Sequence, residues 1–202
     1  MLYNENQEDY NFINNIRVRS FRSHEDIEIS PGKSSVLIVG SNGVGKTSIL
    51  EAISIFSYGK GIRNAKFFEM IKKNKMEFNV DIKLQTTNEF VLEYKTSYHK
   101  ENKTRKVFIN DKEVAANYIR KNIPMLWIAP YTEKIFVGAS TLRRNFIDRL
   151  VNIFDSEHSI RLNEYEKNLK QRSNLLKEKN YDNIWINSIE NNLSKLSVSI
   201  CS

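Results

Sequence analysis

The segment that most constrains this chain is Gly-Ser-Asn-Gly-Val-Gly-Lys-Thr at residues 40–47. It is a complete G-x-x-x-x-G-K-[ST] phosphate-binding loop, a motif that needs a strand before it and a helix after it. Gly40, Gly43 and Gly45 allow the backbone to take positive φ and to turn its N–H groups inward around phosphate oxygens. The segment therefore predicts an α/β nucleotide-binding fold.

The other loop positions have roles that follow from their chemistry. Lys46 is expected to reach the β and γ phosphates, and Thr47 is expected to place its hydroxyl on Mg²⁺. The positive end of the following helix faces the anion and favours its binding. Ser41, Asn42 and Val44 complete the loop, so the whole segment is predicted to bind ATP, with Mg²⁺ as the only expected metal.

The sequence on both sides of the loop agrees with this motif. Val36–Val39 is a continuous apolar run, which is typical of a strand buried on both faces of a parallel sheet. After the loop, apolar residues recur at helical spacing through residues 49–56, and Gly59 and Gly61 supply a stop signal. We therefore expect a strand, the loop and a helix in this order.

More strands are expected from alternating apolar and polar residues. Two precede the loop and three form an antiparallel meander after its helix, at residues 16–19, 27–29, 78–84, 90–94 and 107–109. A second short apolar run, Met125–Ala129, could return to the core sheet.

From Ser140 onward the apolar spacing becomes helical, and Ser140 itself fits an N-cap. Two later runs, within residues 162–176 and 185–200, have nearly coiled-coil spacing on either side of a polar break at 179–183. The pattern predicts an antiparallel helical arm or, with equal support, a helical bundle packed on the core. The predicted domains are a flexible extension at 1–11, a head at 12–139 and the helical arm at 140–202.

The excess positive charge lies in one part of the sequence. Residues 60–121 hold 15 of the 31 Lys and Arg but only 8 of the 24 Asp and Glu, which leaves 16 of each sign elsewhere. A concentrated basic segment is typical of a protein that binds a polyanion, and the nucleic acid backbone is the natural candidate. We select Lys103, Arg105 and Lys106 as candidate DNA contacts, and a solvated surface in a lysine-rich protein is the alternative.

Other features argue against several classes of protein. The single cysteine, Cys201, excludes an internal disulfide framework, and the three histidines are too scattered to suggest a metal site. The chain has no apolar run of about 18 residues and no hydrophobic segment at its N-terminus. We therefore expect a cytoplasmic protein without a membrane span.

Four blocks of residues follow one another in a specific order. They are Ser20-Phe21-Arg22-Ser23, the phosphate loop with Leu50-Glu51-Ala52-Ile53, then Arg143-Arg144-x-Phe146-Ile147-Asp148-Arg149-Leu150, and finally Leu169-Lys170-Gln171-Arg172-x-x-Leu175-Leu176-Lys177. In this order they resemble the RecF family of bacterial DNA repair ATPases. The resemblance implies a P-loop ATPase head of the ABC and SMC type, with a mixed sheet, an antiparallel β meander and a helical arm.

The resemblance also implies a function. In this family two heads sandwich ATP between the phosphate loop of one subunit and the signature motif of the other, and the dimer clamps DNA near single-strand gaps. It implies recombinational repair with RecO and RecR, binding of double-stranded and single-stranded DNA, and an ATP-dependent homodimer. Arg22 resembles an arginine that approaches the phosphates in related ATPases, and a surface arginine at a strand end is the alternative.

Two family elements are absent from the sequence. One is the leucine-serine-x-glycine-glutamine signature, and the other is an apolar strand that ends in paired acids, which would hold Mg²⁺ and position water. Both follow the helical arm in the family, so the chain resembles the N-terminal half of a RecF. Ser41 and Val44 differ from frequent family residues without removing an essential phosphate contact. We expect very slow or no ATP hydrolysis by this chain alone, and turnover in an extended version.

Two other functions are open on sequence grounds. A GTP switch or a small-molecule kinase would also use a phosphate loop, but no Asn-Lys-x-Asp guanine-reading motif is present, and Lys73-Asn74-Lys75-Met76 lacks the required acid. The other possibility is an inactive fragment with an incomplete core, which a cooperative melting transition would exclude.

Overall fold

The computed structural model describes residues 11–57, 61–86, 88–116, 118–119, 123, 125–135, 137–177 and 182–201. Contacts divide the chain into two compact units, Met1–Ile123 and Pro124–Ser202. The second unit begins before residue 140, because the 3₁₀ helix η1 (Pro130–Ile135) packs against the helix α4 (Ser140–Phe154). The extension expected at residues 1–11 lies outside the described residues except for its last position.

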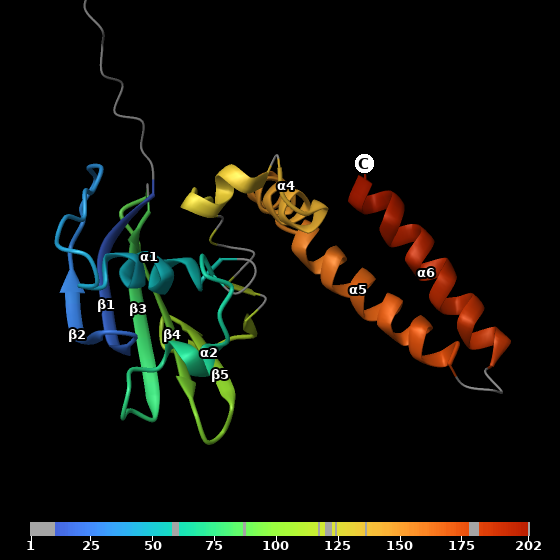
Figure 1. The fold of residues 1–202 in the computed structure, drawn as a ribbon, viewed down its shortest axis with the longest axis horizontal. Coiled ribbons are helices and arrows are strands. Elements are labelled where there is room, and N and C mark those ends of the chain that lie inside the picture. Colours follow the sequence, from blue (N-terminus) through green and yellow to red (C-terminus); the bar gives the residue numbers. More distant parts are fainter. Residues whose placement is uncertain are drawn as a thin grey trace, which may run out of the picture. The chain divides into compact units, whose positions relative to one another are not determined.

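The first unit contains a six-stranded sheet with the strand order β2-β1-β3-β4-β5-β6 (Figure 1). The strands are β1 (Phe12–Phe21), β2 (His24–Ile29), β3 (Glu77–Gln85), β4 (Val91–His99), β5 (Thr104–Ile109) and β6 (Lys112–Glu113). Every neighbouring pair among these described strands is antiparallel. The two strands predicted before the loop and the meander predicted after its helix are therefore confirmed, and they form one sheet.

One face of this sheet is covered by helices. The helix α1 (Lys46–Ser54) contacts β1 and β3, and the short helix α2 (Phe67–Met70) contacts β4. Alternate strand residues point to these helices and are buried, among them Ile16, Val18, Val80, Ile82, Tyr94 and Val107. Burial of side chains of this size stabilises a fold by about 1.5–3 kcal/mol each. The core of the first unit therefore lies between the sheet and α1.

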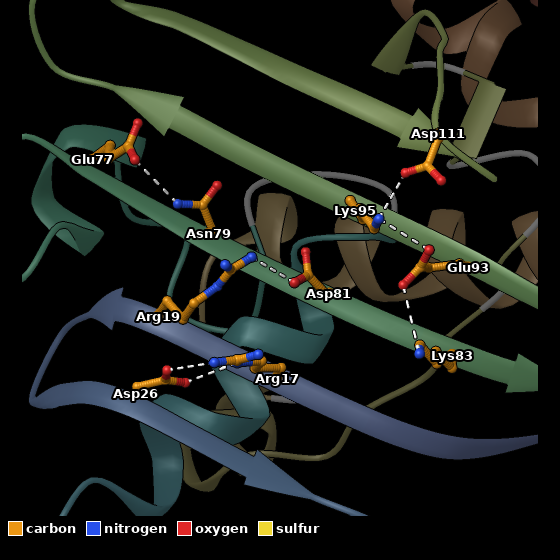
Figure 2. A network of polar contacts seen from close by, with 10 residues as sticks. All are labelled: Arg17, Arg19, Asp26, Glu77, Asn79, Asp81, Lys83, Glu93, Lys95 and Asp111. Carbon is orange, nitrogen blue, oxygen red and sulfur yellow. Dashed lines mark hydrogen bonds and ion pairs between the residues drawn. The ribbon is translucent and has the colours of Figure 1, made fainter.

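The opposite, outer face of the sheet carries charged residues that pair within and between strands, as Figure 2 shows. The pairs are Arg17 with Asp26, Arg19 with Asp81, and Lys95 with both Glu93 and Asp111. Adjacent strand residues point to opposite faces, which separates this charged set from the apolar set. Positive charges on these strands are therefore partly neutralised by acids beside them.

Val36–Val39 is not a strand, although its apolar sequence predicted one. The exposed fractions are 51% for Val36, 84% for Leu37 and 77% for Val39. A strand requires a neighbour that exchanges backbone hydrogen bonds with it, and no described segment pairs with this run. The prediction was wrong because an apolar run shows its own hydrophobicity but does not show whether a partner strand is present. The described sheet therefore has antiparallel pairs and lacks the parallel strand that this run predicted.

The second apolar run, Met125–Ala129, is not a strand either. Its last residue starts a turn of η1, in which the Ala129 N–H donates to Thr132 Oγ1 at 2.9 Å and the Thr132 N–H donates to the Ala129 carbonyl at 2.7 Å. Local hydrogen bonds of this kind compete with strand pairing. The run therefore belongs to the second unit and forms no strand of the described sheet.

The second unit consists mainly of α4, α5 (His158–Leu175) and α6 (Asn183–Cys201). The helices α5 and α6 pack against each other around Leu175, Ile186, Ile189, Leu193 and Tyr165. The predicted pair of helices is confirmed, and its projection from the head stays a prediction. Ala139 and not Ser140 occupies the N-cap of α4. None of the described helices has the length and apolar character that crossing a bilayer requires.

Candidate nucleotide-binding site

The phosphate loop has the backbone geometry that its glycines allow. Gly40, Gly43 and Gly45 have φ values of 156°, 89° and 101°. Gly45 is also the N-cap of α1, so the loop runs directly into the first helical turn at Lys46. The first N–H groups of a helix have no partner within it, and they carry the positive end of the helix dipole. The loop therefore presents backbone donors to an anion.

The turn between β1 and β2 packs directly on this loop. A Cβ atom at Gly45 would lie 2.5 Å from both Ser23 Oγ and His24 Nε2, which is too close for a real contact. His24 Nε2 is 3.0 Å from the Gly45 carbonyl oxygen. Because a carbonyl only accepts, this contact places a proton on Nε2. A side chain at position 45 would therefore be strained by the positive φ, and the side chains of Ser23 and His24 would have to shift.

The charged and hydroxyl groups of the loop border a pocket of about 600 Å³. Lys46 Nζ donates to the carbonyls of Gly40 at 2.7 Å and Ser41 at 2.8 Å. Thr47 is exposed and lines the pocket together with Asn42 and Lys46. Ligand pockets of this type commonly have volumes of about 300–1,000 Å³. The pocket is therefore large enough for a nucleotide.

Arg22 lines this pocket, but an acid holds its side chain. Arg22 Nη2 donates to Glu51 Oε1 at 2.6 Å, and Arg22 Nε donates to Glu51 Oε2 at 2.9 Å. Arg22 Nη1 donates to the Glu69 carbonyl at 2.6 Å. The family resemblance implied that Arg22 approaches the phosphates, but it did not identify the acid that holds this side chain. A direct contact between Arg22 and ATP stays a prediction.

Glu51 and Arg63 are site residues that sequence reasoning missed. Glu51 belongs to α1 and is completely buried, and Arg63 Nη1 donates to its Oε2 at 3.1 Å. A signal was present, because Glu51 interrupts the apolar face formed by Ile49, Ala52 and Ile55. An acid inside such a face requires cationic partners. The sequence could therefore have predicted an ion pair here, but not which arginines supply it.

The three candidate DNA contacts do not share one face of the sheet. Lys103 and Lys106 are exposed, whereas Arg105 points toward the helix face. Arg105 Nη2 donates to the Ile55 carbonyl at 2.9 Å, and its guanidinium lies 4.9 Å from the ring centroid of Phe67. The alternation of strand β5 explains this difference between adjacent residues.

Comparisons with known proteins extend over nearly the whole chain. A family model described as an AAA domain matches residues 15–199. The DNA replication and repair protein RecF of Rickettsia typhi (strain ATCC VR-144 / Wilmington) is 33% identical over 186 residues, which cover 92% of this chain and 51% of that relative. The protein of the same name from Rickettsia prowazekii (strain Madrid E) is 33% identical over 189 residues, with 94% and 52% coverage.

Solved structures show the same fold. A structure of the recombination mediator protein RecF with ATP, from the RecFOR pathway, matches with a TM-score of 0.87 and 22% sequence identity. The match covers 98% of this chain and 54% of the solved chain. The predicted α/β P-loop ATPase fold is therefore confirmed. The chain spans about half the length of the curated relatives that it matches.

Proposed function

Because the chain belongs to the AAA-domain family and is a homologue of the RecF proteins over nearly all of its length, we propose that it binds ATP in the pocket beside residues 40–47. The main observation is the phosphate loop at the start of α1. Its three glycines have positive φ, and Lys46 and Thr47 line a pocket beside it. The solved RecF structure with ATP supports this proposal.

The loop residues suit a triphosphate and its metal. The Lys46 ammonium has three donors, so it can exchange the carbonyls of Gly40 and Ser41 for phosphate oxygens. The exposed hydroxyl of Thr47 is an oxygen ligand of the kind that Mg²⁺ accepts beside phosphate oxygens and water. Mg²⁺ would neutralise part of the phosphate charge. The roles of Gly40 to Thr47 are accordingly backbone donation, cation contact and metal ligation.

ATP titration of the 202-residue chain tests this proposal. We expect the native chain to bind ATP and ADP, and Lys46→Ala to weaken ATP binding at least about tenfold, because it removes a charge-assisted contact. Lys83→Ala, on the outer face of the sheet, is the matched control and should bind as the native chain does. A folded native chain that takes up neither nucleotide would contradict the proposal, and a preference for GTP would favour a GTP switch.

The proposed role in the cell is that of a RecF-type protein of recombinational DNA repair. The relatives named for DNA replication and repair and the RecF structure from the RecFOR pathway support it. We extend the proposal to cytoplasmic location, ATP-dependent dimerisation, partnership with RecO and RecR, and binding of double-stranded and single-stranded DNA. These properties are proposed for the whole protein, because the chain spans only about half the length of the curated relatives that it matches.

DNA binding is proposed for the basic positions of the first unit. Lys103 and Lys106 are exposed and available for phosphate contacts, whereas Arg105 would contribute by fixing strand β5. Phosphate contacts release counterions, so DNA retention should fall steeply with salt. We expect Lys103→Glu combined with Lys106→Glu to reduce retention at every salt concentration. Retention equal to that of the native chain would remove this surface from the proposal.

A further inference from the structure

Glu51 is a fully buried carboxylate in α1 that holds two arginines at the nucleotide pocket. Its Oε1 accepts a hydrogen bond from Arg22, and its Oε2 accepts one from Arg22 and one from Arg63. A buried carboxylate is strongly unfavourable without partners, so both guanidinium groups are constrained by it. Arg22 comes from the turn between β1 and β2, and Arg63 comes from the segment after α1.

The two arginines differ in what they can offer to a ligand. All three nitrogens of Arg22 donate to Glu51 or to the Glu69 carbonyl, and its side chain is 22% exposed. The side chain of Arg63 is 43% exposed, and among the described residues it makes one hydrogen bond, through Nη1 to Glu51. Its Nε and Nη2 groups therefore have all their N–H donors to spare, whereas Arg22 keeps only the second N–H of Nη1 and of Nη2.

Arg63 lines the same pocket as Lys46 and Thr47. A guanidinium presents parallel N–H donors that match phosphate oxygens in pairs. We propose that Arg63 binds the polyphosphate chain of the nucleotide through Nε and Nη2, and that Glu51 is the positioning residue that aims it. Arg22 is the more constrained cation and ties the β1–β2 turn to α1 and α2. This inference rests on the proposed ATP binding of the same pocket.

Arg63→Ala tests the contact in the 202-residue chain, by titration with a fluorescent ATP analogue. We expect affinity to fall roughly tenfold, as for the loss of a hydrogen bond to a charged group. Arg63→Lys should recover part of this loss, because it keeps the charge. The matched control is Arg17→Ala, since the Arg17 side chain is 44% exposed and also pairs with an acid, Asp26, but lies outside the pocket. Its affinity should equal that of the native chain.

A second measurement separates phosphate contact from a structural role. Inorganic tripolyphosphate should displace the fluorescent ATP analogue from the native chain, and Arg63→Ala should weaken this displacement by the same factor as it weakens ATP binding. The melting temperature of each variant is measured alongside. If Arg63→Ala lowers affinity only together with the melting temperature, and tripolyphosphate competes as well as before, Arg63 is structural and the inference is overturned.

The remaining outcomes distinguish this inference from the function on which it rests. Native affinity in Arg63→Ala, together with lost affinity in Lys46→Ala, would overturn the role of Arg63 and leave ATP binding intact. A native chain that does not bind the fluorescent ATP analogue would overturn both. A tenfold loss that Arg63→Lys partly restores, with unchanged melting, would support the inference.

Discussion

Ion pairs lie both on the outer face of the six-stranded sheet and beside the helix that covers its other face, with different consequences. On the outer face, Arg17 and Asp26 have side chains that are 44% and 45% exposed, so water competes with their pairing (Figure 2). On the helix face, Glu51 is completely buried and depends on Arg22 and Arg63. The comparison shows that burial, and not the number of ion pairs, decides which of them fix a structure.

The largest expected effect is at the buried acid. We expect Glu51→Gln to reduce the free energy of unfolding by about 3–5 kcal/mol, because two guanidinium groups lose their buried counter-charge. The matched outer-face variant is Glu93→Gln, whose native carboxylate contacts Lys83 and Lys95, and it should lose at most about 1 kcal/mol. Urea unfolding followed by circular dichroism measures both. Equal losses in the two variants would show that burial does not distinguish the two ion pairs.

A smaller effect is expected at the phosphate loop, where the constraint is backbone conformation and close packing and not charge. Gly45→Ala combines a positive φ with a Cβ only 2.5 Å from Ser23 Oγ, and we expect it to cost about 2–4 kcal/mol. Gly32→Ala is the control, because Gly32 also has positive φ but no atom within 4 Å of the added Cβ. It should cost about 1–2 kcal/mol. Thermal melting measures both variants. Identical melting temperatures would show that the β1–β2 turn moves away from the added Cβ without loss of stability.

Two adjacent residues of β5 differ in the same way. Arg105 faces α1 and donates to Thr96 Oγ1 and to the Ile55 carbonyl, both at 2.9 Å. We expect Arg105→Ala to cost about 1–3 kcal/mol, because it removes these bonds from a half-buried site. Lys106→Ala, on the outer face, should change stability by less than about 0.5 kcal/mol. The same urea titration measures both, and a larger loss in Lys106→Ala would reverse the assignment of the two faces.

The smallest expected effect is a difference in pH dependence within the outer face. Burial raises the pKa of Asp81 above its ordinary 3.8 despite the nearby Arg19, so the fold gains stability as pH falls through that raised pKa. The hydrogen bond from Arg17 lowers the pKa of Asp26, so its contribution is lost as pH falls. Asp81→Asn should therefore lose stability more steeply than the native chain on acidification, and Asp26→Asn less steeply.

Urea unfolding at about pH 7 and about pH 4 measures these slopes. The native chain is the reference for both variants, because each substitution removes a single titrating carboxyl group. Parallel pH profiles for the two variants would show that burial at Asp81 is too weak to distinguish it from Asp26.

Local features of the sequence were sufficient for much of the fold. Alternation predicted β1, β2 and the meander because side-chain direction along a strand is set by the backbone itself. The glycine spacing predicted a phosphate loop followed by a helix, because the loop and the first helical turn are formed by neighbouring residues. The helices α5 and α6 were predicted for the same reason, from the repeat of their apolar residues.

The phosphate loop, the alternating strands and the helical periods follow from the sequence alone, because each depends on residues that are close along the chain. Tertiary contacts were needed to establish that Val36–Val39 forms no strand, that Glu51 binds Arg22 and Arg63, and that Arg105 faces inward. Strand pairing and buried ion pairs need partners that are distant in sequence. Their formation depends on which surfaces folding brings together, and no local pattern records that.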